Sequence, residues 1–147
     1  MRIAVIDGQG GGIGKTLVEK LKAGFGDKID ILALGTNALA ASIMLKAGAD
    51  EGASGENAIV VNANKVDLIV GSIGIIAANS MLGELSPAMA RAIGESRARK
   101  VLIPFNRCNI TVAGTRNIPL QQCIDDAIGL IGELLEATAD QNGRNRT

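Results

Sequence analysis

Residues 3–14 read Ile3-Ala4-Val5-Ile6-Asp7-Gly8-Gln9-Gly10-Gly11-Gly12-Ile13-Gly14. The first four are apolar and mostly β-branched, which is typical of a strand buried on both faces. A loop with five glycines in seven residues follows. Beyond it, Leu17, Leu21 and Phe25 recur every four positions, which predicts an amphipathic helix. The stretch therefore predicts a buried strand joined to a helix by a glycine-rich loop.

The same alternation of strand and helix patterns continues along the 147 residues. Further strands are predicted at residues 29–34, 51–53, 67–70 and 101–105, with a weaker one at 110–112. Further helices are predicted at residues 36–48, 54–64, 86–96 and 119–137. Strands separated by helices form βαβ units and a mostly parallel sheet. The predicted fold class is therefore α/β: a three-layer sandwich with a sheet of five to six strands and helices on both faces.

Helix ends are predicted from capping chemistry. Thr36 and Ser54 are expected to be N-caps, and Gly48 is expected to end the helix that Thr36 begins. Ser86 is expected to cap a helix whose first residue is Pro87, where a missing N–H has no cost. The helix after Thr36 is expected to bury Leu39, Ile43, Met44 and Ala47.

Charge and composition exclude several classes of function. Fifteen basic residues balance fifteen acidic ones, whereas neutralising nucleic-acid phosphates requires a basic surplus. Histidine, tyrosine and tryptophan are absent, which excludes imidazole catalysis, Ser-His-Asp triads and histidine metal sites. We therefore expect neither a nucleic-acid partner nor a metal site.

The length indicates one domain, residues 1–139, followed by a polar tail, residues 140–147, that is expected to be disordered. Two cysteines cannot build a disulfide scaffold. The longest apolar stretch, residues 68–78, is interrupted by small residues and is shorter than the ~18 residues that span a bilayer. With no signal peptide visible at the start, a cytoplasmic location without a membrane partner is expected.

The glycine loop has the features of an anion-binding site. Glycine lets a ligand approach the backbone closely, and a helix start offers free N–H groups and a positive dipole end. The loop departs from the G-x-G-x-x-G and P-loop patterns, while Gly8-x-x-x-Gly12-x-Gly14 resembles the cofactor loop of short-chain dehydrogenases. A simple tight turn and a variant P-loop stay open as alternatives. The residues predicted to bind a phosphate-bearing ligand here are Gly8, Gln9, Gly10, Gly11, Gly12, Ile13 and Gly14.

The resemblance to short-chain dehydrogenases covers the first third of the chain and does not extend to the catalytic residues of those enzymes. Those enzymes use a Tyr-x-x-x-Lys pair, and this chain has no tyrosine. A ribose-binding acid is expected ~20 residues on, at the end of the second strand, where the chain reads Gly35-Thr36-Asn37. The sequence therefore leaves NAD(P) or another nucleotide open as cofactor, with Thr36 and Asn37 as candidates for contacting a 2′-phosphate.

The carboxyl ends of parallel strands meet at one edge of a sheet, where ligands bind. The loops after the second, fourth and fifth strands should therefore join the glycine loop there. Arg107 is the expected anion contact, because its guanidinium matches a phosphate, and Lys15 is either a phosphate contact or a solvated charge. Asn79, Ser80 and Glu84 are expected to form a lid or wall. The further candidates for ligand binding are Thr36, Asn37, Gly71, Ser72, Asn106 and Arg107.

Three side chains near this edge carry possible chemistry. Asp7 is interpreted as a cap for loop N–H groups, with a metal or ribose contact as the alternative. Cys108 follows Arg107, which would lower the pKa of the thiol, and packing is its alternative role. Cys108 and Glu84 are the candidate catalytic residues, while Cys123 is expected to be a small core residue.

The final predicted helix is apolar over too wide an arc for a monomer. Between Leu120 and Leu135 its apolar residues cover about 160°, whereas a helix on a sheet needs about 100°. The excess comes from Ile128 and Leu135 at one margin and Leu130 at the other. We therefore expect a homodimer, unless the loops around Gly83 or Thr115 cover a margin.

Five stretches together carry a family resemblance: residues 3–14, 33–38, 52–58, 79–84 and 103–108. They are similar to a small bacterial family called domain of unknown function 3842, from residue 1 to about residue 137. The resemblance implies a stand-alone Rossmann-like protein and brings no activity with it. From the glycine loop and the absence of histidine and tyrosine, we expect a nucleotide- or dinucleotide-binding protein. The alternatives are an enzyme that acts on a phosphorylated substrate or nicotinamide cofactor through carboxylate, lysine or Cys108 chemistry, and an assembly protein with an empty crevice.

Overall fold

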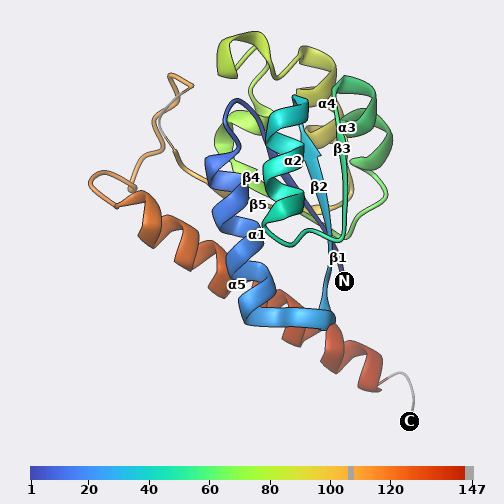
Figure 1. Cartoon of the computed structure of the whole chain (residues 1–147). Coiled ribbons are helices and arrows are strands. Elements are labelled where there is room, and N and C mark those ends of the chain that lie inside the picture. Colours follow the sequence, from blue (N-terminus) through green and yellow to red (C-terminus); the bar gives the residue numbers. More distant parts are fainter. Residues whose placement is uncertain (106–107, 145–147) are drawn as a thin grey trace.

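The computed structural model describes residues 1–105 and 108–144. Figure 1 shows a sheet flanked by helices, and all its strand pairs are parallel. In space the strand order is β3-β2-β1-β4-β5. The strands are β1 (Arg2–Asp7), β2 (Asp30–Gly35), β3 (Glu51–Ser54), β4 (Leu68–Ser72) and β5 (Arg99–Ile103). The helices are α1 (Gly12–Phe25), α2 (Ala38–Lys46), α3 (Glu56–Asn62), α4 (Pro87–Glu95) and α5 (Leu120–Arg144), with short 3-10 turns η1 (Gly26–Lys28), η2 (Ile73–Ile76) and η3 (Met81–Gly83).

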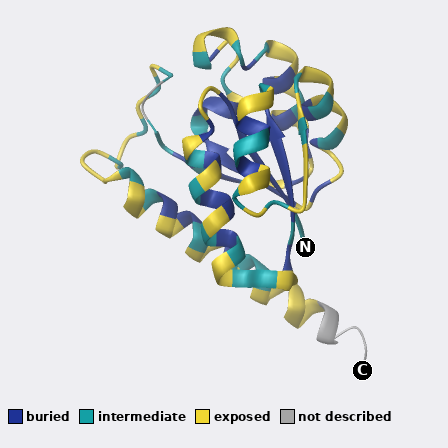
Figure 2. Cartoon of the chain, in the orientation of Figure 1, coloured by how far each residue is buried: buried dark blue, intermediate teal, exposed yellow. Residues whose placement is uncertain are grey.

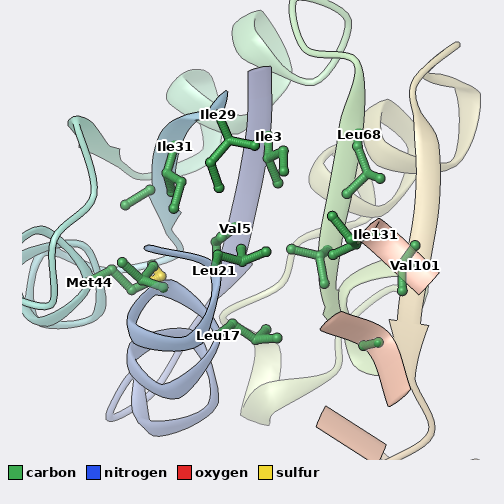
Figure 3. Close-up of a cluster of buried hydrophobic side chains, with 14 of the residues drawn as sticks. Ile3, Val5, Leu17, Leu21, Ile29, Ile31, Met44, Leu68, Val101 and Ile131 are labelled. Atoms are coloured by element: carbon green, nitrogen blue, oxygen red, sulfur yellow. The ribbon is translucent and has the colours of Figure 1, made fainter. Parts of the chain in front are cut away.

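Two hydrophobic cores lie on opposite faces of the sheet. Successive side chains of a strand point to opposite faces of the sheet. The residues of β1 therefore contribute in turn to one core and then to the other. Ile3 and Val5 pack with residues of α1 and α5, as Figure 3 shows for Leu17, Leu21 and Ile131. Ala4 and Ile6 pack with residues of α3 and α4. Figure 2 shows the central strands β1, β2 and β4 buried between helices whose outer surfaces are exposed. The predicted three-layer α/β, Rossmann-like sandwich is therefore confirmed.

The fifth strand and the segment after it differ from the prediction. β5 ends at Ile103 rather than Phe105, because Pro104 has no N–H to donate to a strand pair. Residues 110–112 form no strand, so the prediction of a weak sixth strand is wrong. The positive φ angles of Asn109 and Gly114 place turns on both sides of this short run and leave it as a loop.

Two predicted N-caps are wrong by one residue. The side chain of Asn37, not Thr36, accepts a hydrogen bond from the N–H of Ala40 at 2.8 Å. Gly55, not Ser54, precedes α3, because Ser54 belongs to β3. Ser86 caps α4 as predicted. Gly48, with φ 119°, follows the end of α2 as predicted.

Helix α2 buries only part of the face that the sequence predicts. Met44 is buried and Ala47 packs against the core, as predicted, and Ile43 is half-buried. Its buried residues are Ala40, Ala41 and Met44, whereas Leu39 is 59% exposed. A Cβ on Gly11 would lie 3.0 Å from Cα of Ala40. The helix therefore lies so close to the glycine loop that small side chains, rather than leucine, fill the interface.

The last helix is longer than predicted. The sequence places its end near Ala137, whereas α5 continues to Arg144, since no proline stops it. From Glu136 to Gln141 its residues are exposed, and Figure 2 shows these last turns extending beyond the sheet.

Candidate functional site

A pocket of about 640 Å³ lies at the carboxyl ends of β1 and β4. β1 is followed in sequence by its neighbour β2, whereas β4 lies on its other side. Such a change of direction in the strand order is where ligands bind in open α/β sheets. The volume lies within the roughly 300–1,000 Å³ that is typical of small-molecule sites. The lining residues are Asp7, Gly8, Gln9, Gly10, Gly11, Gly12, Ile13, Ser72, Gly74, Met81, Leu82, Phe105, Cys108 and Leu120.

The pocket is lined by most of the glycine-loop residues that the sequence predicts to bind a ligand, but several predicted residues from other loops lie elsewhere. Residues 8–13, Ser72 and Cys108 do. Gly14 is buried behind the loop against Met44 and Asp7, and Gly71 is packed against the carbonyl oxygen of Ile6. Asn106 and Arg107 lie outside the described residues. The predicted residues that the structure describes away from the lining are Gly14, Lys15, Thr36, Asn37, Gly71, Asn79, Ser80 and Glu84.

The loop glycines fall into two groups. A Cβ on Gly8 would collide with Thr36 and Met81, one on Gly14 would lie 2.9 Å from Cβ of Asp7, and Gly11 has φ 71°. The fold itself therefore requires glycine at these three positions. By contrast, a Cβ on Gly10 or Gly12 would meet nothing within 4 Å, and neither residue has a positive φ. Both line the pocket, and the packing leaves room for a side chain at either position.

Several N–H groups of the loop are already used within the protein. The N–H groups of Gly8 and Gly14 donate to Asp7, and that of Gly11 donates to the carbonyl of Gly8. Among the described residues, no acceptor pairs with the N–H of Gly12 or Ile13. These two belong to the first turn of α1, where the helix dipole gives a partial positive charge. The loop therefore offers two free donors to a ligand.

Asp7 ends β1 as a buried carboxylate. Its Oδ1 accepts from the N–H of Gly8 at 2.8 Å, and its Oδ2 accepts from the N–H of Gly14 at 2.7 Å. The interpretation of Asp7 as a cap for loop N–H groups is thus confirmed. Burial raises the pKa of Asp7 above its usual value, although the two hydrogen bonds oppose the rise, and the charge of Glu84 adds to it. The pocket therefore contains a carboxyl that holds its proton more tightly than usual.

Glu84 connects three segments that are distant in the sequence. Its Oε1 accepts from the N–H of Gln9 at 3.0 Å, the hydroxyl of Thr36 at 2.8 Å and the side-chain amide of Asn37 at 2.6 Å. Burial alone would raise the pKa of the Glu84 carboxyl, but these hydrogen bonds outweigh it and hold that pKa below its usual value. Glu84 is thus ionised and fixes the segment around η3 against the loops after β1 and β2.

The pairing with Glu84 also decides the positions of Thr36 and Asn37. Both side chains donate to this carboxylate instead of lining the pocket. The sequence does not predict this contact, because Glu84 lies 48 residues from Thr36 and 75 from Gln9. No spacing or periodicity relates such distant positions.

The rest of the lining is largely apolar. Ile13, Met81, Leu82, Phe105 and Leu120 contribute to it, and within the described part of the lining there is no lysine or arginine. Lys15 does not line the pocket and lies 3.8 Å from Glu19 on the exposed side of α1. Sequence reasoning missed Met81, Leu82, Phe105 and Leu120, because they come from three separate segments of the chain.

The two cysteines occupy different surroundings, and both are free. Cys108 lines the pocket, at the edge of the sheet where the sequence predicts it. Cys123 is partly buried and packs against the core beneath α5, which agrees with its predicted packing role.

In residues 1–105 and 108–144, no three cysteine, aspartate or glutamate side chains gather as metal ligands. No helix of that same part of the chain combines the length and the apolar character that crossing a membrane requires.

Comparison with known proteins gives one informative match. The profile of a family described as Domain of unknown function (DUF3842) matches residues 2–136. Comparison with curated proteins and with solved structures gives no match. Because the matched residues cover nearly the whole chain, this protein belongs to the family Domain of unknown function (DUF3842).

Proposed function

We propose that this protein binds a nucleotide or dinucleotide in the cytoplasm, with a phosphate of the ligand on the glycine loop. The observation that carries the proposal is the pair Gly10 and Gly12, which the packing does not require to be glycine and which line the pocket. Glycine at such a position is explained by a ligand that approaches the backbone. The free N–H groups of Gly12 and Ile13 would donate to the phosphate.

The described groups around the loop indicate how a phosphate would be held. Asp7 is a carboxyl in the lining, and the described lining has no basic side chain to balance the charge of several phosphates. The helix dipole supplies only about half a positive charge. Among the described groups, the N–H donors of the loop and the helix dipole are therefore what a phosphate would meet here. The apolar residues on the other walls would hold the base or bases.

The test is a thermal-shift panel of nucleotides, dinucleotides and sugar phosphates. A ligand at 100 times its Kd should add about 2.7 kcal/mol to the free energy of unfolding. We expect at least one nucleotide to stabilise the protein and Gly12→Val to abolish the effect, because the new side chain fills the pocket floor.

Gly24→Val is the matched control. Gly24 lies near the other end of the same helix, is exposed, and has no atom within 4 Å of an added Cβ. The control should therefore keep the ligand effect. If no compound stabilises the protein, the pocket binds no nucleotide and the assembly-protein alternative is favoured. If a ligand stabilises folded Gly12→Val as well as the wild type, the loop is only a turn.

A second candidate function is an enzyme acting on a phosphorylated substrate or nicotinamide cofactor. It is favoured by the presence of Asp7 and Cys108 in one pocket. A carboxyl with a raised pKa suits proton transfer, and a thiol can act as a nucleophile. If a bound compound is converted, Cys108→Ser should retain binding and stop the conversion, measured by mass spectrometry of the compound after incubation.

A further inference from the structure

In sheets with this strand order, an acidic residue at the end of β2 accepts hydrogen bonds from the ribose of a bound dinucleotide. Here β2 ends at Gly35, and Thr36 and Asn37 follow without a carboxylate. The structure nevertheless contains a carboxylate at this point. Glu84, from the segment after β4, accepts hydrogen bonds from both Thr36 and Asn37. An acid from a distant part of the chain thus stands where a strand-end acid is missing.

The two oxygens of Glu84 differ in their surroundings. Oε1 accepts all three of the hydrogen bonds from Gln9, Thr36 and Asn37, whereas Oε2 pairs with no donor among the described residues. Every buried side-chain oxygen and nitrogen in that part of the chain has a partner. The unpaired Oε2 is therefore not fully buried, and it has lone pairs left to accept a hydrogen bond from a ligand.

Glu84 also lies beside the pocket. It binds the N–H of Gln9, which is a lining residue, and it directly follows η3, whose Met81 and Leu82 are lining residues too. The negative charge of Glu84 helps to raise the pKa of Asp7, which is itself a lining residue. A ligand with its phosphate on Gly12 would thus extend toward this carboxylate when its sugar lies over the end of β2.

We propose that Glu84 is the ribose-selecting residue of this site and that the ligand is a nucleotide with free 2′- and 3′-hydroxyl groups. The inference rests on the proposed function and adds the ligand class. A carboxylate oxygen accepts from ribose hydroxyls and repels a 2′-phosphate. The two donors that would otherwise hold a 2′-phosphate, Thr36 and Asn37, are already paired with Glu84. In the described part of the chain, no lysine or arginine forms an ion pair with Glu84.

The experiment compares ligands that differ only at the 2′ position. The probes are NAD⁺ against NADP⁺, and ADP and GDP against their 2′-deoxy forms, with Kd measured by calorimetry. Wild-type protein should prefer the free 2′-hydroxyl by about tenfold or more, since a hydrogen bond to a charged group is worth that much. Glu84→Gln keeps an acceptor for Thr36 and Asn37 but removes the charge, so the preference for NAD⁺ over NADP⁺ should collapse.

Glu19→Gln, an exposed carboxylate on α1 that pairs with Lys15, is the control and should keep the wild-type preference. A purely structural role for Glu84 would weaken NAD⁺ and NADP⁺ equally and leave their ratio unchanged, which overturns the inference. Nucleotide binding by wild-type protein without any 2′ preference overturns it too, while the proposed function stands. Binding of none of these probes overturns both.

Discussion

Asp7 is the residue at which the requirements of the fold and of a ligand compete. Its two oxygens fix Gly8 and Gly14 and so give the loop its shape. The same carboxylate lines the pocket in which a phosphate is proposed. Burial disfavours the charged form of Asp7, and the pKa of its carboxyl is therefore raised.

Because the pKa of Asp7 is raised in the folded protein, we expect the free energy of unfolding to depend on pH. A carboxyl whose folded pKa is raised binds its proton more tightly when folded. Its contribution to stability is therefore fully present below the unfolded pKa, near 3.8, and is lost as pH rises through the folded pKa. In Asp7→Asn this loss should be absent. Urea unfolding of both proteins between about pH 3.5 and 8 should show the wild type losing its advantage with rising pH.

At low pH we expect the wild type to be more stable than Asp7→Asn by an amount set by one hydrogen bond. Asparagine can accept from only one of the N–H groups of Gly8 and Gly14, and the unpaired donor should cost about 1–3 kcal/mol. Wild-type and Asp7→Asn stability curves that run parallel over the whole pH range would contradict the role assigned to burial of Asp7.

At the scale of elements, the packing of α2 depends on two glycines. Gly35 at the end of β2 would place a Cβ 2.6 Å from the backbone nitrogen of Ala41, and Gly11 would place one 3.0 Å from Cα of Ala40. Backbone atoms cannot yield as a flexible side chain can. The close approach of α2 therefore brings the end of β2, with Thr36 and Asn37, beside the glycine loop.

Gly35→Ala should consequently destabilise the protein by about 1–3 kcal/mol or more. The control is Gly24→Ala, at an exposed helical position with open space around it. This control should stabilise by about 0.5–1 kcal/mol, because alanine favours the helix over glycine. Urea unfolding measures both. A Gly35→Ala protein as stable as the wild type would show that α2 can move away from β2 without loss.

At the scale of the whole molecule, the flank of the sheet at β5 ends in a strand edge that pairs with no further strand of the described residues. β5 pairs with β4 alone, and an unpaired strand edge favours association with another chain. Of the apolar margins of α5, Ile128 and Leu135 pack against the core, whereas Leu130 stays 44% exposed. Leu130 and Ile118, itself 41% exposed, line a hollow beside β5 together with Leu102 and Thr115.

We propose that two copies associate through this flank, and we predict the mass of a dimer by light scattering at micromolar concentration. Leu130→Glu should give monomers, because it places a charge in the apolar contact. Leu39→Glu, at an exposed leucine on α2, should leave the dimer intact. A single-chain mass for the wild type would contradict the prediction, and a dimer that tolerates Leu130→Glu would move the interface elsewhere.

The sequence by itself determined the elements with local signals. The apolar run of β1, the glycine loop and the four-residue spacing in α1 all concern neighbours in the chain, and so does the Ser86-Pro87 helix start. The α/β class and the meeting of strand ends at one edge follow from the order of such elements. Residues 8–13 could therefore be named as pocket residues before the structure was known.

Only the tertiary structure decided what depends on distant contacts. Alternation along the chain does not fix the order β3-β2-β1-β4-β5, nor which face α2 buries. From the sequence, all five glycines of the loop were predicted to contact a ligand. Packing shows that the fold needs glycine at Gly8, Gly11 and Gly14 but not at Gly10 and Gly12. Glu84 reaches Thr36 across 48 residues. Such a contact is set by how the loops meet in space, and no local pattern carries that information.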